Sequence, residues 1–341
     1  MQVRDAGPGE METILRRSHP IWSEGMSLDD YLTFNLEQRK SPWGIDRYRF
    51  LVAEESGALV AALKLFNLPG VFEGRTISIA GVGAVFTLPE ARGRGHAGAL
   101  VEAALADARG TGASLALLMS EIGPDLYLRS GFEVIPALEA GCLPYLPVPW
   151  AGEPAWLREE REPAEAVPGL RPLEARDLEA LVAIHDEASR GQRFRLRRDR
   201  PAWEQALLRA GLRRRLLGGQ DDEVLVIEGD PRGAGASKVL AYVVLREVPG
   251  GLEWREHGAR FGAEERLIDL FWTAIARARR AGVNRIDAWQ FPAIVTTRRL
   301  YPIAVRPLRE PAIMLRRLDP SLPPPVFGGP EECRLSWLDL F

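Results

Sequence analysis

Apolar runs of five to eight residues, separated by short polar turns, recur along the chain and predict paired strands. Residues 50–54 and 58–65 are mainly apolar and flank a polar turn at 55–57, a pattern typical of a β-hairpin. Residues 224–228 and 239–245 repeat this pattern in the second half. We therefore expect one hairpin in each half of the chain.

Helical spacing of apolar residues appears at the start of each half, after a short strand-like segment. It is clearest between residues 173 and 188, where the apolar positions favour a helix with one buried face. These positions are Leu173, Leu178, Leu181, Val182 and Ile184.

The two halves align as an internal repeat with an offset of 170 residues, which places residues 104–120 over 274–290 and Gly112 over Gly282. Each segment reads as a helix, a glycine stop and a strand, so the order strand, helix, hairpin, strand, helix, strand occurs twice. We predict a mixed α/β (α+β) fold of two tandem domains, each a twisted mixed sheet flanked by helices.

A chain of 341 residues exceeds what one hydrophobic core usually organises. We expect the first domain at 1–148 and a second at 169–318, joined by a charged, proline-rich linker at 149–168. A proline-rich tail, 319–341, ends in apolar residues that we expect to pack on the protein rather than extend into water.

The charge balance argues against a nucleic-acid partner. The 44 basic and 47 acidic residues give a net charge of −3, which provides no overall field for a polyanion. Arginines concentrate at 193–200 and 213–215, and we interpret them as a solvated face or an interface.

Cysteine content and hydropathy bear on metal sites and location. Only Cys142 and Cys333 occur, too few for a disulfide framework or a cysteine-rich zinc site, so we expect no metal. No run approaches the roughly 18 apolar residues of a membrane helix, and the first ten residues lack the order of a signal peptide. We expect a cytoplasmic protein with no membrane partner.

A glycine-rich turn is the main candidate for chemistry. The uncharged segment 81–88 reads as a buried strand, and residues 89–98 then lead into a helix expected at 99–109. Free amides at a helix N-terminus bind anions, and glycine lets a phosphate approach the main chain. With Arg92 and Arg94 adding charge, a diphosphate ligand is expected here.

The same turn allows two other interpretations. Residues 93–98 satisfy the dinucleotide pattern, and Glu121 stands about where a ribose-binding acid is expected. However, residues 89–92 separate the strand from the first glycine, and the motif follows a hairpin instead of opening a parallel unit. A structural turn without a ligand is the other alternative.

Two motifs in register resemble the GNAT acetyltransferase superfamily. Residues 92–97, Arg-Gly-Arg-Gly-His-Ala, resemble its R/Q-x-x-G-x-G/A signature, and residues 126–132, Leu-Tyr-Leu-Arg-Ser-Gly-Phe, resemble its L-Y-x-x-x-G-F element. The Ser120-Glu121 pair within 117–132 is similar to one in the enhanced intracellular survival acetyltransferases, which carry tandem GNAT domains. With only about 22 residues after Asp319, we expect no counterpart of the third, sterol-carrier-like domain of that family.

The resemblance implies an acetyl-CoA co-substrate and assigns the site residues. The pantetheine arm would pair with the main chain of Val85, Phe86 and Thr87, and Ser120 and Glu121 would lie in the acetyl-CoA site. Tyr127 would protonate the departing thiolate, and the terminal carboxylate of Phe341 would act as the base. The diphosphate would bind a set that includes His96, whose side chain we expect to face solvent: Arg92, Gly93, Arg94, Gly95, His96, Ala97 and Gly98.

The second half lacks the features that the motif needs. Residues 262–268 align with 92–98, and they place Ala263, Glu265 and Ile268 where the glycines stand. Tyr127 aligns with Thr297, whose hydroxyl is a far weaker acid. We predict a degenerate domain without cofactor that walls the acceptor pocket or supports assembly, so a homo-oligomer is possible.

The acceptor is the least defined part of the prediction. Acidic and aromatic residues crowd the segment 22–43 and suit a cationic amine, although an ordinary amphipathic helix explains them equally. We predict transfer of acetyl from acetyl-CoA to a primary amine of a small molecule, aminoglycoside-like or polyamine/lysine-like, by direct attack. The alternative is a non-catalytic acyl-CoA-binding regulator. The acidic and aromatic residues of the segment 22–43 include Glu24, Asp29, Asp30, Tyr31, Phe34 and Glu37.

Overall fold

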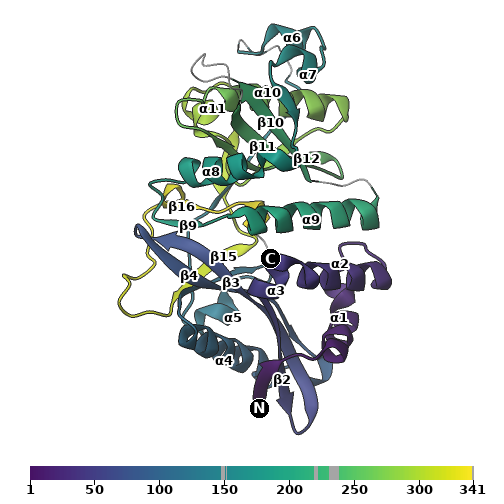
Figure 1. The fold of residues 1–341 in the computed structure, drawn as a ribbon, viewed down its shortest axis with the longest axis vertical. Helices are drawn as coiled ribbons and strands as arrows, with labels where there is room; N and C mark the ends of the chain where they lie inside the picture. The colour runs from purple at the N-terminus through teal and green to yellow at the C-terminus, as the bar shows by residue number, and fades with distance from the viewer. Residues whose placement is uncertain (147–149, 151, 219–221, 230–237, 340–341) are drawn as a thin grey trace.

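The computed structural model describes residues 1–146, 150, 152–218, 222–229 and 238–339. It contains two mixed sheets, each flanked by helices and each with its own apolar cluster (Figure 1). This confirms the predicted fold class. Among the described residues, no helix combines the length and the apolar character required to cross a membrane.

The first sheet has nine strands, with the main order β1-β2-β3-β4-β5-β15-β6, while β9 joins β3 and β16 joins β9. Its hairpin of β2 and β3 turns at Ser56 and Gly57, which have φ of 54° and 79°, so the predicted hairpin is confirmed. The strands are β1 Gln2–Asp5, β2 Tyr48–Glu55, β3 Ala58–Phe72, β4 Arg75–Thr87, β5 Ala113–Ser120, β6 Glu133–Val134, β9 Phe194–Leu196, β15 Ala312–Arg317 and β16 Cys333–Arg334.

Helices of the first half cover this sheet. The helix α4 packs against β3, β4 and β5, and α2 packs against α9 of the second half. The start of α2 is fixed by Ser27, whose hydroxyl accepts a hydrogen bond from the amide of Asp30, a typical N-cap. The helices are α1 Pro8–Trp22, α2 Leu28–Lys40, α3 Pro42–Arg47, α4 His96–Gly110 and α5 Asp125–Leu128, with a 3-10 turn η1 at Pro89–Ala91.

The second sheet has seven strands in the order β14-β7-β13-β12-β11-β10-β8. Its hairpin of β10 and β11 is the second one predicted, and α8 covers the predicted helical segment. The strands are β7 Leu138–Cys142, β8 Leu170–Pro172, β10 Asp222–Gly229, β11 Lys238–Val248, β12 Gly251–Ala259, β13 Ile286–Ala288 and β14 Ala304–Pro307; the helices are α8 Leu178–Ala188, α9 Arg200–Leu217, α10 Arg266–Arg280 and α11 Ala293–Thr297.

The two halves exchange a strand. β7 belongs to the first half in sequence but lies in the second sheet, between β13 and β14. In return β15, its equivalent in the repeat, lies in the first sheet between β5 and β6. The expected division at 1–148 and 169–318 therefore does not follow the sheets, because each sheet needs a strand from the other part of the chain.

The expected linker and tail both pack on the folded core. The described part of 149–168 contains two short helices, α6 Ala155–Arg158 and α7 Pro163–Ala166, and Leu157 is buried in the second core. In the tail, Phe327 packs against Phe72 and Phe194. A last 3-10 turn, η4, spans Trp337–Asp339 and contacts β12.

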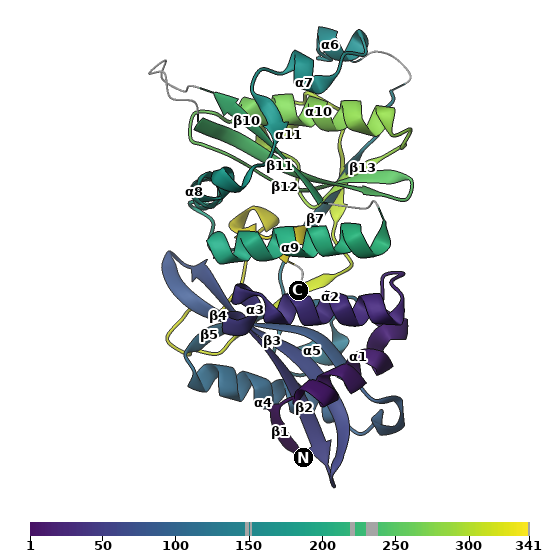
Figure 2. The same ribbon diagram turned by 45° about the vertical axis from the view of Figure 1, so that its right-hand side comes forward.

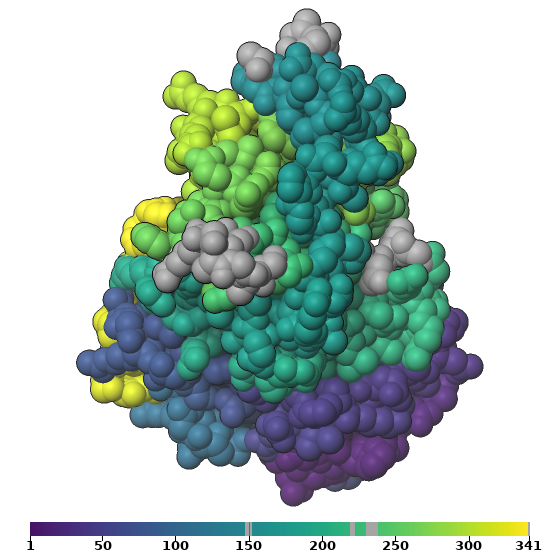
Figure 3. All heavy atoms as spheres, turned by 45° about the horizontal axis from the view of Figure 1, so that its top comes forward, coloured from purple at the N-terminus to yellow at the C-terminus, as the bar shows by residue number. Residues whose placement is uncertain are grey.

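The helix α9 lies between the two sheets, beside α2 (Figure 2). In the space-filling view the purple and blue atoms of the first half meet the teal and green atoms of the second along a continuous boundary (Figure 3). Residues of α9 can therefore face the first sheet, and this places second-half side chains near the predicted chemistry.

Candidate active site

The edge of β4 is open where the pantetheine arm was expected. β4 and β5 run parallel, and their ladder ends at Val82, which pairs with Leu118. β4 continues to Thr87, and there it pairs only with β3. A register shift opposite Ala62–Lys64 and a φ of 46° at Ala84 mark a bulge at this point. A bulge re-aims backbone groups, so main-chain donors and acceptors near Val85 remain available on the β5 side.

The glycine-rich turn has the geometry of an anion site. Gly93 and Gly95 have φ of 77° and 81°, a backbone region that favours glycine. Gly95 is the N-cap of α4, which therefore starts at His96, three residues before the expected start. The amides of residues 93–98 donate no hydrogen bond to a described residue, and a Cβ at Gly98 would meet open space. An anion can approach these amides closely.

The side chains of this turn differ in their roles. Arg94 pairs with Glu55 at 2.6 Å, and the Nε of Arg92 donates to the carbonyl of Thr87 at 3.3 Å. The expectation that His96 faces solvent is wrong: its side chain is 6% exposed. The ring turns inward at the start of α4, and its Nε2 is therefore buried. This atom has no hydrogen-bond partner among the described residues.

The three residues expected beside the thioester meet at the end of β5. Tyr127 is buried, its ring packs edge-on against Phe132, and burial raises the pKa of its hydroxyl. That hydroxyl forms no hydrogen bond with a described residue. Ser120 donates to the carbonyl of Gly123 at 2.6 Å, which closes the turn, and Glu121 is exposed.

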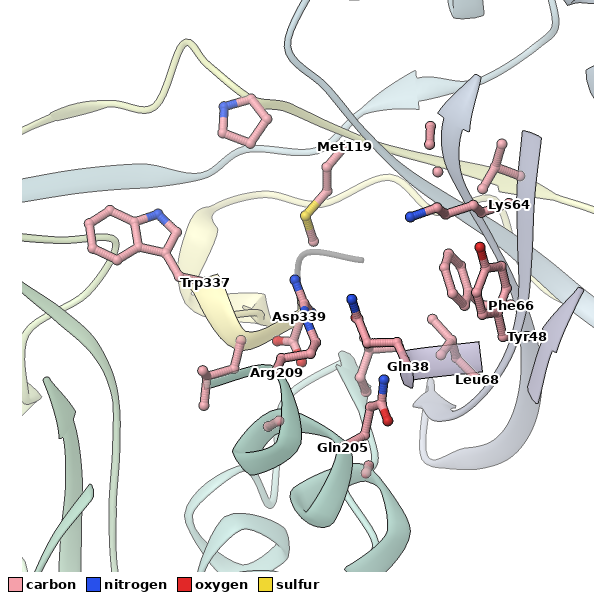
Figure 4. A pocket seen from close by; sticks show the side chains of 18 of the residues that line it. Gln38, Tyr48, Lys64, Phe66, Leu68, Met119, Gln205, Arg209, Trp337 and Asp339 are labelled. Atoms are coloured by element: carbon pink, nitrogen blue, oxygen red, sulfur yellow. The ribbon is translucent and has the colours of Figure 1, made fainter. Parts of the chain in front are cut away.

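These residues open into one cavity of about 740 Å³ (Figure 4). Its wall at the first sheet is formed by Val82 to Val85 of β4, by Met119 to Ile122 at the end of β5, and by Tyr127. The opposite walls come from α2, α9, β11, β12 and the turn η4. The cavity thus connects the open β4 edge with a chamber between the two halves.

The comparison with protein families identifies the first part of the chain. The family model described as an acetyltransferase (GNAT) domain matches residues 3–135. This segment is similar to GNAT acetyltransferase domains. The match covers β1 to β6 and includes both motifs of the sequence, and it confirms the predicted enzyme class, an acyltransferase.

Solved structures show the same fold over nearly the whole chain. A GCN5-related N-acetyltransferase from Anabaena variabilis is 17% identical with a TM-score of 0.66, covering 93% of this chain and 72% of that one. Eis1 from Mycobacterium abscessus is 17% identical, with a TM-score of 0.59 and coverage of 94% and 74%. N-myristoyltransferase of Saccharomyces cerevisiae with bound myristoyl-CoA is 13% identical, with a TM-score of 0.53 and coverage of 91% and 80%. No curated protein matches the chain.

The equivalent position in the second half is built differently from the GNAT turn. The carboxylate of Glu264 accepts a hydrogen bond from the amide of Gly262, where the first half leaves amides free. Glu265 precedes α10 and pairs with Arg298. Thr297 donates to the carbonyl of Ala293, within its own helix. The absence of cofactor from this half stays a prediction that these contacts support.

Sequence reasoning did not find the chamber side of the cavity. Lys64 had a weak signal, as a single lysine within an apolar strand, but nothing in the spacing links it to the others. The fold alone brings these residues together: Lys64, Arg198, Gln205, Arg209, Arg213, Arg246, Arg255, Trp337 and Asp339.

Phe341, the expected base, lies outside the described residues, so its role stays a prediction.

Proposed function

We propose that the protein is an N-acetyltransferase that moves an acetyl group from acetyl-CoA to a primary amine of a small molecule. The observation that carries the proposal is a single cavity that joins the open β4 edge at Val85 with Tyr127 and with a chamber for an acceptor. The free amides of residues 93–98 suit the diphosphate of CoA. The neighbour that carries bound myristoyl-CoA supports an acyl-CoA ligand on this fold.

The reaction needs an amine, a thioester and a proton donor in one place. The thioester supplies the acetyl group, and the amine nitrogen attacks its carbonyl carbon. The C–N bond forms, the C–S bond breaks and the thiolate leaves. In this proposal, a main-chain N–H at the β4 bulge stabilises charge on the carbonyl oxygen. Only a neutral amine attacks, so a protonated amine first loses one proton to a base. The nitrogen loses a second proton after the C–N bond forms.

Tyr127 is the acid in this proposal. Its buried hydroxyl has a raised pKa, so it is protonated at neutral pH and can donate to the leaving thiolate. The substitution Tyr127→Phe keeps the ring contact with Phe132 and removes only the hydroxyl. We expect kcat to fall by about 10²-fold or more, with acetyl-CoA affinity unchanged by calorimetry.

The control for this test is Tyr145→Phe, an exposed tyrosine whose hydroxyl donates to the carbonyl of Arg279 in the second half. We expect this variant to keep wild-type turnover. Loss of acetyl-CoA binding in Tyr127→Phe would instead assign Tyr127 to the binding site. Full turnover in Tyr127→Phe would remove it from the mechanism.

The non-catalytic regulator remains the second candidate, since the cofactor turn alone serves either role. It is favoured only if acetyl-CoA binds while a broad amine panel releases no thiol. The chamber beside Tyr127 favours the enzyme, because a sensor has no need for an acceptor space at the thioester.

A further inference from the structure

The chamber side of the cavity is rich in cations. Eight of the residues that line the cavity are lysine or arginine and four are aspartate or glutamate. In Figure 4, the side chains of Lys64 and Arg209 approach the same space from opposite walls, near Gln38 and Met119. The basic residues are Arg47, Lys64, Arg197, Arg198, Arg209, Arg213, Arg246 and Arg255.

Arginines already occupy three of the four lining carboxylates. Glu24 binds Arg213 at 2.7 Å, and Asp339 binds Arg198 at 2.5 Å. Glu253 binds Arg255 at 2.9 Å. Only Glu121 forms no ion pair with a described residue, and it is exposed at the β5 end of the cavity. The chamber therefore offers few carboxylates to a cationic ligand.

Two cations of the chamber have no carboxylate partner among the described residues. The ammonium of Lys64 donates to the amide oxygen of Asn35 at 2.7 Å, and the nearby carboxylate of Glu24 is itself paired with Arg213. The Nε of Arg246 is buried without a hydrogen-bond partner in the described part of the chain. Its neighbours on adjacent strands, Asp222 and Glu253, both bind Arg255.

The pKa values of these groups are lowered first by burial and then by repulsion between the cations. Burial lowers the pKa of Lys64 to about 8, with Arg209 and Arg213 adding to the shift. Burial, Arg213 and Arg255 lower the pKa of Arg209 to about 9, and the pKa of Arg246 is also lowered, by the same three causes. An anion placed among these groups relieves the repulsion.

We infer that the acceptor is an amine that also carries an anionic group, a carboxylate or a phosphate, which Lys64 and Arg246 help to bind in the chamber. The inference rests on the proposed function, which supplies the thioester in the same cavity. It changes the expected acceptor class, because a polycation would add charge to a wall that already has an excess of cations. Asp29, Asp30 and Glu37, which suggested a cationic acceptor, do not line the cavity.

An anion anchored in the chamber also orients the acceptor. Lys64 lies on β3 and pairs with Gly83 beside the β4 bulge, whereas Arg246 lies on β11 of the second sheet, and both line the cavity that contains Val85 and Tyr127. An acceptor whose anionic group is held by these cations is therefore bound in the same cavity as the β4 edge. Binding energy from a part of the substrate remote from the reaction then places the nucleophile.

Matched amines that differ by one anionic group test the inference. We would measure CoA release from acetyl-CoA with phenylalanine against phenethylamine for a carboxylate, and with phosphoethanolamine against ethanolamine for a phosphate. Spermidine is the polycationic comparison. We expect the anionic member of at least one pair to have a kcat/KM about tenfold or more above its partner, and which pair responds distinguishes carboxylate from phosphate.

Variants connect this preference to the chamber. Lys64→Met and Arg246→Met should remove most of the preference for the anionic amine, because each removes a cation that binds the anionic group. Lys40→Met is the matched control, because Lys40 is exposed on α2 and pairs only with Glu37. An equal or higher kcat/KM for the neutral amines or spermidine overturns the inference.

Product binding separates this inference from the proposed function. We would titrate the CoA-loaded protein with N-acetylphenylalanine and with N-(2-phenylethyl)acetamide, and repeat the comparison with N-acetylphosphoethanolamine and N-acetylethanolamine. Tighter binding of an anionic product, lost in Lys64→Met, supports the anion site even without turnover. Equal affinities, or no binding of either anionic product, overturn it. Failure of acetyl-CoA itself to bind rejects the proposed function instead.

Discussion

At the scale of single residues, the protonation state of Lys64 affects the charge of the chamber wall. The chain has lysine only at positions 40, 64 and 238, so NMR of lysine labelled with ¹³C at Cε follows three signals. The groups that face the Lys64 ammonium are Asn35 on α2, the ring of Tyr48 on β2, Arg209 and Arg213 on α9, and Glu24.

We predict one lysine signal that titrates at about 8 and disappears in Lys64→Met. Because the folded pKa is lowered, the unfolded chain binds the proton more tightly, and this group adds stability as the pH rises from about 8 to about 10.4. A Lys64 signal that titrates near the ordinary value of about 10.4 would show that this lysine is well solvated.

A second residue-scale prediction concerns Glu256, at the interface of η4 with β12. Its carboxylate is buried, binds Arg198, and accepts from Tyr242 at 2.7 Å and Ser336 at 2.6 Å. Arg198 holds its pKa well below the usual range, so its contribution is present above about pH 4.3 and is lost as the pH falls.

Glu256→Gln should lower the free energy of unfolding by about 3 kcal/mol at pH 7, because it leaves Arg198 buried with a weaker partner. Chemical denaturation measures this change. Glu204→Gln, which breaks an exposed pair with Arg200 on α9, should change it by less than about 1 kcal/mol. Equal effects of the two substitutions would mean that the buried ion pair does not stabilise the fold.

At the scale of secondary-structure elements, the exchanged strands join the two halves. Without β15, β5 loses its neighbour along Leu115 to Ser120, which includes fully buried apolar residues. A protease site inserted at the exposed residues 159–161 tests this connection. After cleavage, we expect both fragments to elute together in gel filtration and to separate only on denaturation.

A chain that encodes 1–148 alone should fail to give a dispersed NMR spectrum, because its sheet lacks β15 and an edge of apolar residues is exposed. The full-length chain is the control. Separate elution of the cleaved fragments, together with a dispersed spectrum for 1–148, would show that the first half folds without the exchanged strand.

At the scale of the whole molecule, the sequence predicts the helices and strands better than it predicts which strands pair with one another. The hairpins, the helix at 178–188 and the glycine turn follow from local periodicity and backbone preference, which act over neighbouring residues. The exchange of β7 and β15 does not, because two equivalent repeats contain strands that fit either sheet. The inward turn of His96 likewise depends on where α4 begins.

The candidate site also has one part that the sequence predicts and one part that it does not. Gly93, Gly95 and Tyr127 belong to compact motifs, so the sequence alone predicts the cofactor side. The chamber is assembled from β3, α9, β11 and η4, whose side chains meet only after the halves pack together. Single arginines such as Arg246 carry no local pattern that marks them as part of a site.

The most direct test of the central claim is calorimetric titration of the full chain with acetyl-CoA, comparing wild type with Gly95→Glu. Gly95 has φ of 81° and caps the turn, so the variant places a carboxylate where the diphosphate should bind. The control is Gly74→Glu, in the turn between β3 and β4, with φ of 73° and no neighbour within 4 Å of an added Cβ.

We predict one acetyl-CoA site per chain in wild type and Gly74→Glu, and loss of binding in Gly95→Glu while it remains folded. NADH should not bind to any of the three proteins. Absence of acetyl-CoA binding in wild type, or equal binding in Gly95→Glu, would contradict the assignment of this turn as the cofactor site.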